Sequence, residues 1–515
     1  MSESSFSETF TAEPDPDYMF SGWQRRERGF CGGNAAPCSL STVGFENSLV
    51  LAAVLEGDDE FFLTPTFKQR AWRGGSCSTS LSKTPVAERF SFKEFFTAAD
   101  NAVGTLSAEI VSLSTDTGAI QINGGDTSAP ASGFKVDWGD GTIDEGVFFP
   151  FFHQYADLTR DYTILVQASA ENELSNTVRL SAYFIEEPIE YIANLDPDIN
   201  VSIPEQVPVL GTVLYNPPTH LEPLPLESLG DIDRDDMEYL LSVAANIQAE
   251  ALGCDVEVSG DRFEQEVYTD PEFENAASIW YTRPAGFVIG TGFLEGAFAH
   301  TVYWHEMGHN FTANYPASYR YGGRLDGNAN AIYGETVAQI FQHVTAYEII
   351  NRASELGIPT KIRDEMENSA LSAFRFNAQQ YREYMEQGMP FASWNEGDTE
   401  EDETLMTFTT MAYKFVEYAE AEGIGFIVPL QRMMCALSVF DAGLQQRWSQ
   451  NANTPEAELF RSTFMVSAMT YAFGDSVVED FRQLGFPIDD ETISALGARQ
   501  VSACAVRSPR SGFPS

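Results

Sequence analysis

The sequence WHEMGHN at residues 304–310 contains the pattern H-E-x-x-H in a setting that favours a helix. Apolar residues recur at positions 298, 302, 304, 307 and 311, a spacing that predicts a helix over 297–313. Side chains one helical turn apart lie one above the other, so His305 and His309 can bind one Zn²⁺ ion while Glu306 lies beside them as a general base. With six histidines in 515 residues, chance rarely produces this pattern, which makes it a strong signal for a metal site.

A catalytic zinc site also needs a third protein ligand and an open position. Thr312 and Tyr315 occupy the positions at which a metzincin carries Gly and His, which excludes that class. Glu335 is the better candidate, because it begins a second amphipathic helix with apolar residues at 337, 340, 341, 344 and 347, and an acid in the first turn suits the helix dipole. This is the gluzincin arrangement. Two weaker alternatives are Asp326, in a Gly/Asn loop, and Glu348, which is expected on the solvent face.

Two further stretches accompany the motif and the Glu335 spacing: the Gly-rich strand AGFVIG at 285–290 and the sequence DFRQLGFPI at 480–488. With them, residues 281–351 resemble the M60-like (enhancin-related) metallopeptidases, and residues 480–488 resemble the end of that family's helical subdomain. The resemblance implies an endopeptidase with one Zn²⁺ per chain. It also implies protein or glycoprotein substrates, often heavily glycosylated and mucin-like.

Hydrolysis in such a site is metal-assisted: zinc lowers the pKa of its water toward about 7, and Glu306 accepts the proton and passes it to the leaving amine. An extended substrate pairs its main chain with an edge strand, for which the sequence predicts Phe287, Val288, Ile289 and Gly290. A transition-state stabiliser would be a Tyr, His or Arg near the metal. The sequence leaves several candidates open: Tyr321, Arg324, Tyr333, His343, Tyr381 and Tyr384.

Upstream of the motif, short alternating strands and Gly/Asp/Asn turns predict a β-sandwich. Gly139 and Gly141 allow a tight turn whose amides Asp140 can bond, and Trp138 and Tyr155 are expected to fill the core. The stretches WGDGT at 138–142, HQYA at 153–156 and YTILV at 162–166 carry this pattern. They resemble a PKD domain, an Ig-like sandwich usually found outside cells, which implies a spacer or a binding module.

The predicted fold class is therefore multidomain: a β-sandwich followed by an α+β zincin-type domain with a largely helical C-terminal subdomain. The predicted boundaries are a disordered N-terminus at 1–18, a small β-rich module at 19–101, the sandwich at 102–185, a Pro-rich linker at 186–227, the metallopeptidase domain at 228–507 with its helical subdomain at 331–507, and a tail at 508–515.

The composition narrows the range of partners. Lys and Arg number 30 against 76 Asp and Glu, for a net charge of −46, so the surface repels phosphate backbones and anionic lipid. Nucleic acid is therefore excluded as a partner. No apolar run approaches the roughly 20 residues of a transmembrane helix. A protein kept soluble in high salt would carry such an acidic surface, because salt screens its self-repulsion.

The six cysteines include no C-x-x-C pair, which excludes a cysteine zinc site. Cys31 and Cys38 frame a loop that a disulfide could close. The apolar settings of Cys254 and Cys435 suit free buried thiols as well as disulfides, so both alternatives stay open for these two residues. The N-terminus is acidic and polar, unlike a signal peptide. An extracellular location is expected from the sandwich resemblance, the acidity and the cysteines.

Two functional hypotheses follow. The first is a zinc endopeptidase that acts on extracellular proteins. The second is a non-catalytic adhesion or glycan-binding protein that retains the zincin fold as a scaffold. The intact Glu306 favours the enzyme, because a binding module has no use for a general base beside two metal ligands.

Overall fold

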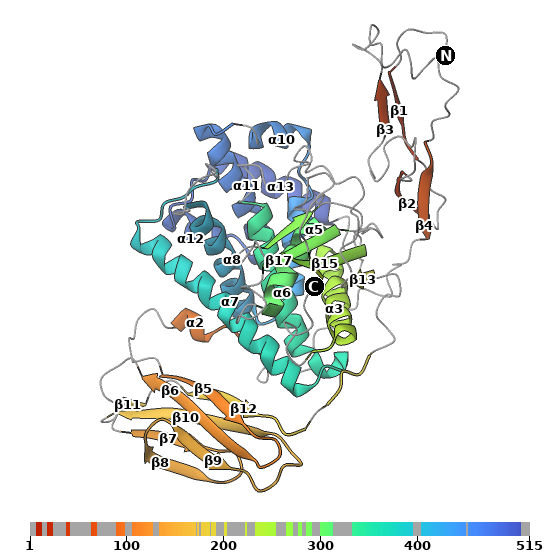
Figure 1. Cartoon of the computed structure of the whole chain (residues 1–515). Coiled ribbons are helices and arrows are strands. Elements are labelled where there is room, and N and C mark those ends of the chain that lie inside the picture. Colours follow the sequence, from red (N-terminus) through yellow and green to blue (C-terminus); the bar gives the residue numbers. More distant parts are fainter. Residues whose placement is uncertain are drawn as a thin grey trace, which may run out of the picture.

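The computed structural model has strands in the first half of the chain and mostly helices in the second (Figure 1). Both halves of this division are as the sequence predicts. The structure describes residues 7–12, 18–23, 38–41, 63–69, 89–97, 106–126, 133–170, 173–174, 177–185, 187–191, 200–202, 222–223, 232–253, 264–270, 277–280, 285–290, 299–312, 332–394, 403–449 and 452–505.

Two antiparallel strand pairs come first. β1 (Ser7–Phe10) pairs with β3 (Cys38–Ser41), and β2 (Tyr18–Trp23) pairs with β4 (Pro65–Gln69). The prediction of a disordered segment at 1–18 is therefore wrong for β1, which forms a strand. The sequence does not reveal this strand, because its hydrogen-bonding partner β3 lies about 30 residues later in the chain. Cys38 takes part in a disulfide.

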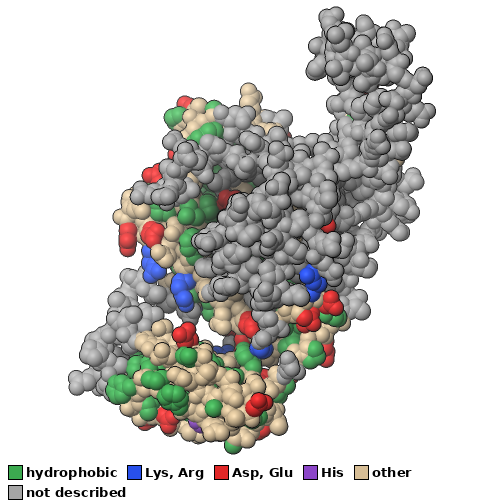
Figure 2. Space-filling view, viewed as in Figure 1, with side chains coloured by type: hydrophobic (Ala, Val, Ile, Leu, Met, Phe, Trp, Pro, Cys, Tyr) green, Lys and Arg blue, Asp and Glu red, His purple; other side chains and the backbone are tan. Residues whose placement is uncertain are grey.

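The sandwich comprises two antiparallel sheets on one hydrophobic core. Its strands are β5 (Leu106–Leu113), β6 (Ala119–Asp126), β7 (Gly133–Asp137), β8 (Ile143–Val147), β9 (Phe151–Gln154), β10 (Tyr162–Ala170), β11 (Glu173–Leu174) and β12 (Val178–Ala182). One sheet has the order β5-β6-β9; in the other, β10 pairs with β7, β11 and β12, and β7 pairs with β8. Figure 2 shows hydrophobic side chains gathered at one end of the sandwich.

The tight turn of the sandwich has the expected construction. Gly139 has a φ of +76°, a conformation that side chains disfavour. Asp140 accepts a hydrogen bond from the Thr142 amide at 2.8 Å. Trp138 and Tyr155 are buried, and the Tyr155 hydroxyl donates to the Trp138 carbonyl at 2.9 Å. The turn therefore fixes two large core residues against each other.

Residues 89–97, here called the strap, insert into the helical half of the molecule and include the short helix α2 (Glu94–Thr97). The Phe90 amide donates to Asn351 Oδ1 at 2.8 Å, and the Phe92 amide donates to Glu420 Oε1 at 2.7 Å. The sequence assigns the strap to a separate module at 19–101. That boundary is wrong, because the buried Phe90 and Phe92 rings belong to the core of the helical half.

A mixed sheet precedes the helix that carries the H-E-x-x-H motif. Its strands are β13 (Asn200–Ser202), β14 (Glu222–Pro223), β15 (Glu264–Asp270), β16 (Ala277–Trp280) and β17 (Ala285–Gly290). β13 and β14 both pair with β15. Residues 186–227 are therefore not simply a linker, because two segments within them contribute strands to this sheet.

The prediction that Phe287 to Gly290 form an edge strand is also wrong. β17 pairs with β15 on one side and with β16 on the other, and Phe287, Val288 and Ile289 are fully buried. A continuous apolar run is typical of such an interior strand. Among the described strands, β16 lies at the edge next to β17.

The helical half shares one hydrophobic core with the mixed sheet and the strap. Its helices are α3 (Arg234–Leu252), α5 (Ala299–Thr312), α6 (Gly334–Asn351), η4 (Ala353–Leu356), α7 (Thr360–Glu386), α8 (Glu403–Glu422), α9 (Ile427–Leu437), α10 (Ala442–Trp448), α11 (Pro455–Phe473), α12 (Ser476–Gln483) and α13 (Asp490–Ala505). α6 lies at its centre, in contact with α3, α5, α7, α8 and α9 (Figure 1). No helix among the described residues is long and apolar enough to cross a bilayer.

Cys435 of α9 forms a disulfide with Cys504 of α13. Of the two alternatives that the sequence leaves open for Cys435, the structure has the disulfide, because α13 packs against α9 and brings Cys504 beside it. Cys254 and Cys31 lie outside the described residues.

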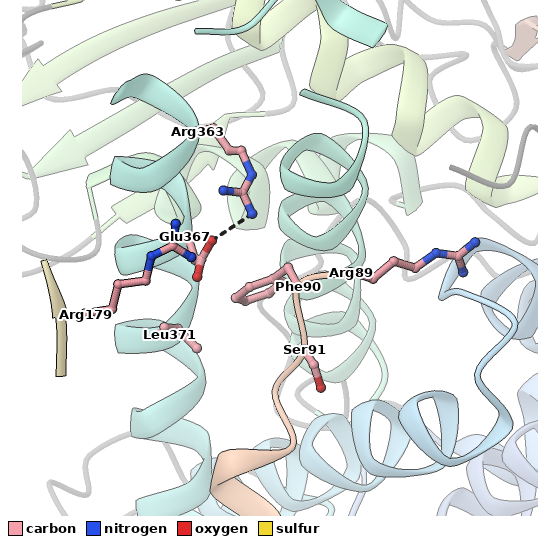
Figure 3. Close-up of a pocket in the computed structure, with 7 residues that line it drawn as sticks. All are labelled: Arg89, Phe90, Ser91, Arg179, Arg363, Glu367 and Leu371. Carbon is pink, nitrogen blue, oxygen red and sulfur yellow. Dashed lines mark ion pairs between the residues drawn. The ribbon is translucent and has the colours of Figure 1, made fainter. Parts of the chain in front are cut away.

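The sandwich meets the helical half at α7. Asp364 accepts hydrogen bonds from Ser181 at 3.0 Å and from the Tyr183 hydroxyl at 2.6 Å. A cavity of about 230 Å³ lies at this junction, lined by Arg89, Phe90, Ser91, Arg179, Arg363, Glu367 and Leu371 (Figure 3). Arg363 pairs with Glu367 at 3.0 Å along α7. The junction joins the sandwich, the strap and α7.

Candidate metal centre

Two packed helices bring three metal-ligating side chains together. His305 and His309 lie one turn apart on α5, and Glu335 lies in the first turn of α6. The two Nε2 atoms are 3.2 Å apart, and Glu335 Oε2 lies 3.3 Å from His305 Nε2 and 3.4 Å from His309 Nε2. The structure therefore places the three sequence-predicted ligands at one point.

The size of this triangle fits a zinc ion. Bonds of about 2.0–2.1 Å in a tetrahedral site put neighbouring donor atoms roughly 3.3–3.4 Å apart. Two imidazoles and one carboxylate are also a donor set that zinc accepts in catalytic sites. Among the described residues, these three form the one group that could hold a metal. The Glu335 side chain is 37% exposed, so this ligand is not fully enclosed.

Glu306 lies on α5 between the two histidines in sequence and is buried, with 4% of its surface exposed. Burial raises the pKa of its carboxyl to about 7, His305 opposes this rise, and Glu335 adds to it. A carboxyl with a pKa near neutrality can both take up and release a proton at physiological pH, which is the property of a general base.

Glu335 has the opposite electrostatic setting. Desolvation opposes its ionisation, but the imidazoles of His309 and His305 outweigh that effect, so the pKa of the carboxyl lies well below its usual range. The structure thus gives two neighbouring glutamates different properties: Glu335 is ionised, as a metal ligand must be, and Glu306 can carry a proton.

The candidates for transition-state stabilisation differ in position. Tyr333 is the N-cap residue of α6, two residues before Glu335, and its side chain is buried. Tyr321 and Arg324 lie outside the described residues, as does the alternative ligand Asp326. Tyr333 is therefore the described candidate nearest in sequence to the three ligands.

The remaining candidates make contacts within the helical half. His343 is fully buried, and its Nε2 accepts a hydrogen bond from Asn377 at 2.7 Å. Burial lowers the pKa of the His343 imidazole to about 3. The Tyr381 ring stacks on Tyr413 of α8 with centroids 4.4 Å apart. The Tyr384 hydroxyl donates a hydrogen bond to the carbonyl of Leu484, a residue 100 positions later in the chain, at 2.8 Å. The described contacts of these three side chains are therefore structural.

Glu348 does not lie on the solvent face as expected. It is buried, because α6 is enclosed by other helices. It follows Glu335 by 13 residues, roughly 20 Å along the helix, which excludes it as an alternative ligand. Burial raises the pKa of its carboxyl to about 7.

The strand beside the helix α5 that lies at the sheet edge is β16, which the sequence analysis does not predict as an edge strand. α5 packs directly against β16 as well as against β17. The sequence Ala277-Ser278-Ile279-Trp280 has a short strand-like alternation, but it carries a weaker apolar signal than AGFVIG at 285–290.

Comparisons with models of protein families, with curated proteins and with solved structures find no match for this chain. Its function must therefore be inferred from its own residues and their geometry.

Proposed function

We propose that this protein is a zinc-dependent endopeptidase of the gluzincin type, with one Zn²⁺ per chain. The observation that carries the proposal is the triangle of His305, His309 and Glu335, with donor atoms 3.2 to 3.4 Å apart. The buried Glu306 beside it adds the proton acceptor that peptide hydrolysis needs. The resemblance of residues 281–351 to M60-like metallopeptidases agrees with this proposal.

In the proposed mechanism, a zinc ion held by His305, His309 and Glu335 would lower the pKa of a water molecule and polarise the scissile carbonyl. Glu306 takes the proton from the attacking water onto its carboxylate and then gives it to the leaving amine. Burial raises the pKa of the Glu306 carboxyl, which favours its role in both transfers, because the same group must accept a proton and release it in one turnover. Glu335 stays ionised and serves as a ligand.

An extended substrate would pair its main chain with β16. This strand uses one side for β17, and no described strand pairs with its other side. α5 packs against β16, so a peptide on that edge would run close to the helix that carries His305 and His309.

We further propose that the substrates are extracellular proteins or glycoproteins. The Cys435–Cys504 disulfide supports this location, because disulfides persist mainly in oxidising compartments. The sandwich, which resembles a PKD domain, would act as a spacer or a binding module at α7.

The test is a cleavage assay on casein and on mucin with purified zinc-loaded protein. The wild type should cut at least one of them, and a chelator should abolish cutting.

Glu306→Gln should lower kcat about 10²- to 10⁴-fold, because it removes the general base, while zinc stays bound. His309→Ala should lose zinc as well as activity. Glu348→Gln makes the same chemical change at a buried glutamate far from the triangle and should keep its activity.

Cutting that a chelator leaves unchanged would contradict the proposal. Zinc-loaded wild type that binds mucin without cutting either substrate would instead support the adhesion or glycan-binding alternative.

A further inference from the structure

Gly308 lies on α5 at its contact with α6. A Cβ atom added there would lie 3.1 Å from the Ala338 Cα, 3.1 Å from the Phe341 Cβ and 3.3 Å from the Ala338 carbonyl oxygen. Few real Cβ contacts are this short, so the two helices approach as closely as a glycine allows. A glycine within a helix costs about 1 kcal/mol relative to alanine, which indicates that this position serves packing rather than helix formation.

α6 is held on the side away from Gly308. Asn377 of α7 accepts a hydrogen bond from Gln339 at 3.0 Å and donates one to His343 at 2.7 Å. These two α6 residues lie one turn apart, and His343 and Asn377 are fully buried. Ala338 and Phe341 are fully buried as well. A larger side chain at residue 308 would therefore press on buried residues of α6, a helix that is hydrogen-bonded to α7 on its other side.

The helix α5 is also hydrogen-bonded to a third helix, α3. Gln248 of α3 donates a hydrogen bond to the Trp304 carbonyl of α5 at 2.8 Å, and the Gln248 side chain is fully buried. A side chain at residue 308 would have to push apart two helices that are each tied to a third.

We propose that Gly308 is a positioning residue of the metal centre: its missing side chain sets the separation of α5 and α6 at which Glu335 reaches His305 and His309. The proposal rests on the proposed function, because it assigns a role toward the same zinc ion. The donor distances across the two helices are 3.3 and 3.4 Å. Metal–ligand distances tolerate deviations of only about 0.2 Å, so a displacement of a few tenths of an ångström weakens the third bond.

The test compares the zinc affinity of wild type, Gly308→Ala and Gly308→Val by competition with a chromophoric chelator. Residues that orient metal ligands typically change metal affinity about 10- to 100-fold, so we expect a Kd about tenfold higher for the alanine variant and a larger rise for valine. Gly497→Ala is the matched control, because nothing lies within 4 Å of a Cβ at that helical glycine. Its Kd should equal that of the wild type.

Two further measurements separate positioning from folding. The visible absorption of the cobalt-substituted protein reports ligand geometry, and it should change in Gly308→Ala but not in Gly497→Ala. The metal-free Gly308→Ala protein should remain folded in chelator by circular dichroism, because the better helix propensity of alanine offsets packing strain.

Each outcome has one meaning. An unchanged Kd together with an unchanged cobalt spectrum in Gly308→Ala would overturn the positioning role and leave the proposed function intact. If the metal-free Gly308→Ala protein is unfolded, Gly308 is needed for folding and not specifically for the metal centre, and this result would also overturn the proposal. Wild-type protein that binds no zinc would contradict the proposed function itself.

Discussion

Three glutamates on two adjoining helices, α5 and α6, differ in what surrounds their carboxyl groups. Glu335 lies beside two imidazoles, Glu306 is buried next to them, and Glu348 is buried on α6 far from both. The sequence identifies the first two, because H-E-x-x-H and a first-turn acid have a chemical rationale. It misplaces Glu348, because a glutamate in a helix is exposed by default. Only the packing of five helices around α6 shows that this carboxyl is enclosed.

The burial of Glu348 makes a pH-dependent prediction. Burial raises its pKa to about 7 from an ordinary value of 4.5, against the attraction of Arg352. Between these two pH values the folded protein holds a proton that the unfolded chain releases, so this group's contribution to the free energy of unfolding falls as pH rises through the window. Glu348→Gln should therefore stabilise the protein at pH 8 by on the order of 3 kcal/mol, and little at pH 5.

Denaturant unfolding of wild type and Glu348→Gln at the two pH values measures this difference. An equal effect of the substitution at pH 5 and pH 8 would show that the Glu348 carboxyl is already ionised in the folded protein at low pH.

At the scale of elements, local sequence patterns predict where a helix forms better than they predict which elements pack beside one another. The helix expected at 297–313 is observed as α5, and the helix expected to begin at Glu335 is observed as α6. The prediction that AGFVIG at 285–290 forms an edge strand is wrong, because this strand has a partner on each side. The sequence of a strand does not show how many partners it has, since these come from segments elsewhere in the chain. The strap shows the same limit: its phenylalanines are visible in the sequence, but their partners lie more than 250 residues later.

The strap should be an energetic part of the helical half. Phe92 is fully buried and contacts the rings of His343, Phe374 and Phe426. Phe92→Ala should lower the free energy of unfolding by about 3–5 kcal/mol, because it leaves a cavity in the core. Thermal or denaturant unfolding followed at the helical circular-dichroism signal measures the loss.

Phe152→Ala is the matched control for Phe92→Ala. The Phe152 side chain is 66% exposed on the sandwich, so its removal should change stability by about 0.5 kcal/mol or less. Equal effects of the two substitutions would mean that the strap does not dock in the helical core.

At the scale of the whole molecule, composition predicts several domains and an acidic surface, and the order of strands then helices follows from local patterns. The domain boundaries are less predictable, because β13 and β14 come from a Pro-rich stretch and the strap from a presumed separate module. Both segments gain their structure from contacts with residues far along the chain.

The net charge of −46 predicts a strong effect of salt. Like charges on the folded surface repel each other, and the screening length falls from about 10 Å at 0.1 M salt to about 3 Å at 1 M. The melting temperature should therefore rise when NaCl is increased over this range, and choline chloride at equal ionic strength should have the same effect. A melting temperature that stays constant or falls would show that self-repulsion does not limit the stability of this fold.

The central claim is that two imidazoles of α5 and one carboxylate of α6 hold a single zinc ion. The most direct measurement is the anomalous-difference map of zinc-loaded crystals collected at the zinc edge. We expect one strong peak per chain within about 2.0–2.2 Å of His305 Nε2, His309 Nε2 and a carboxylate oxygen of Glu335. A map with no peak at this triangle, or with its peak on other side chains, would contradict the claim.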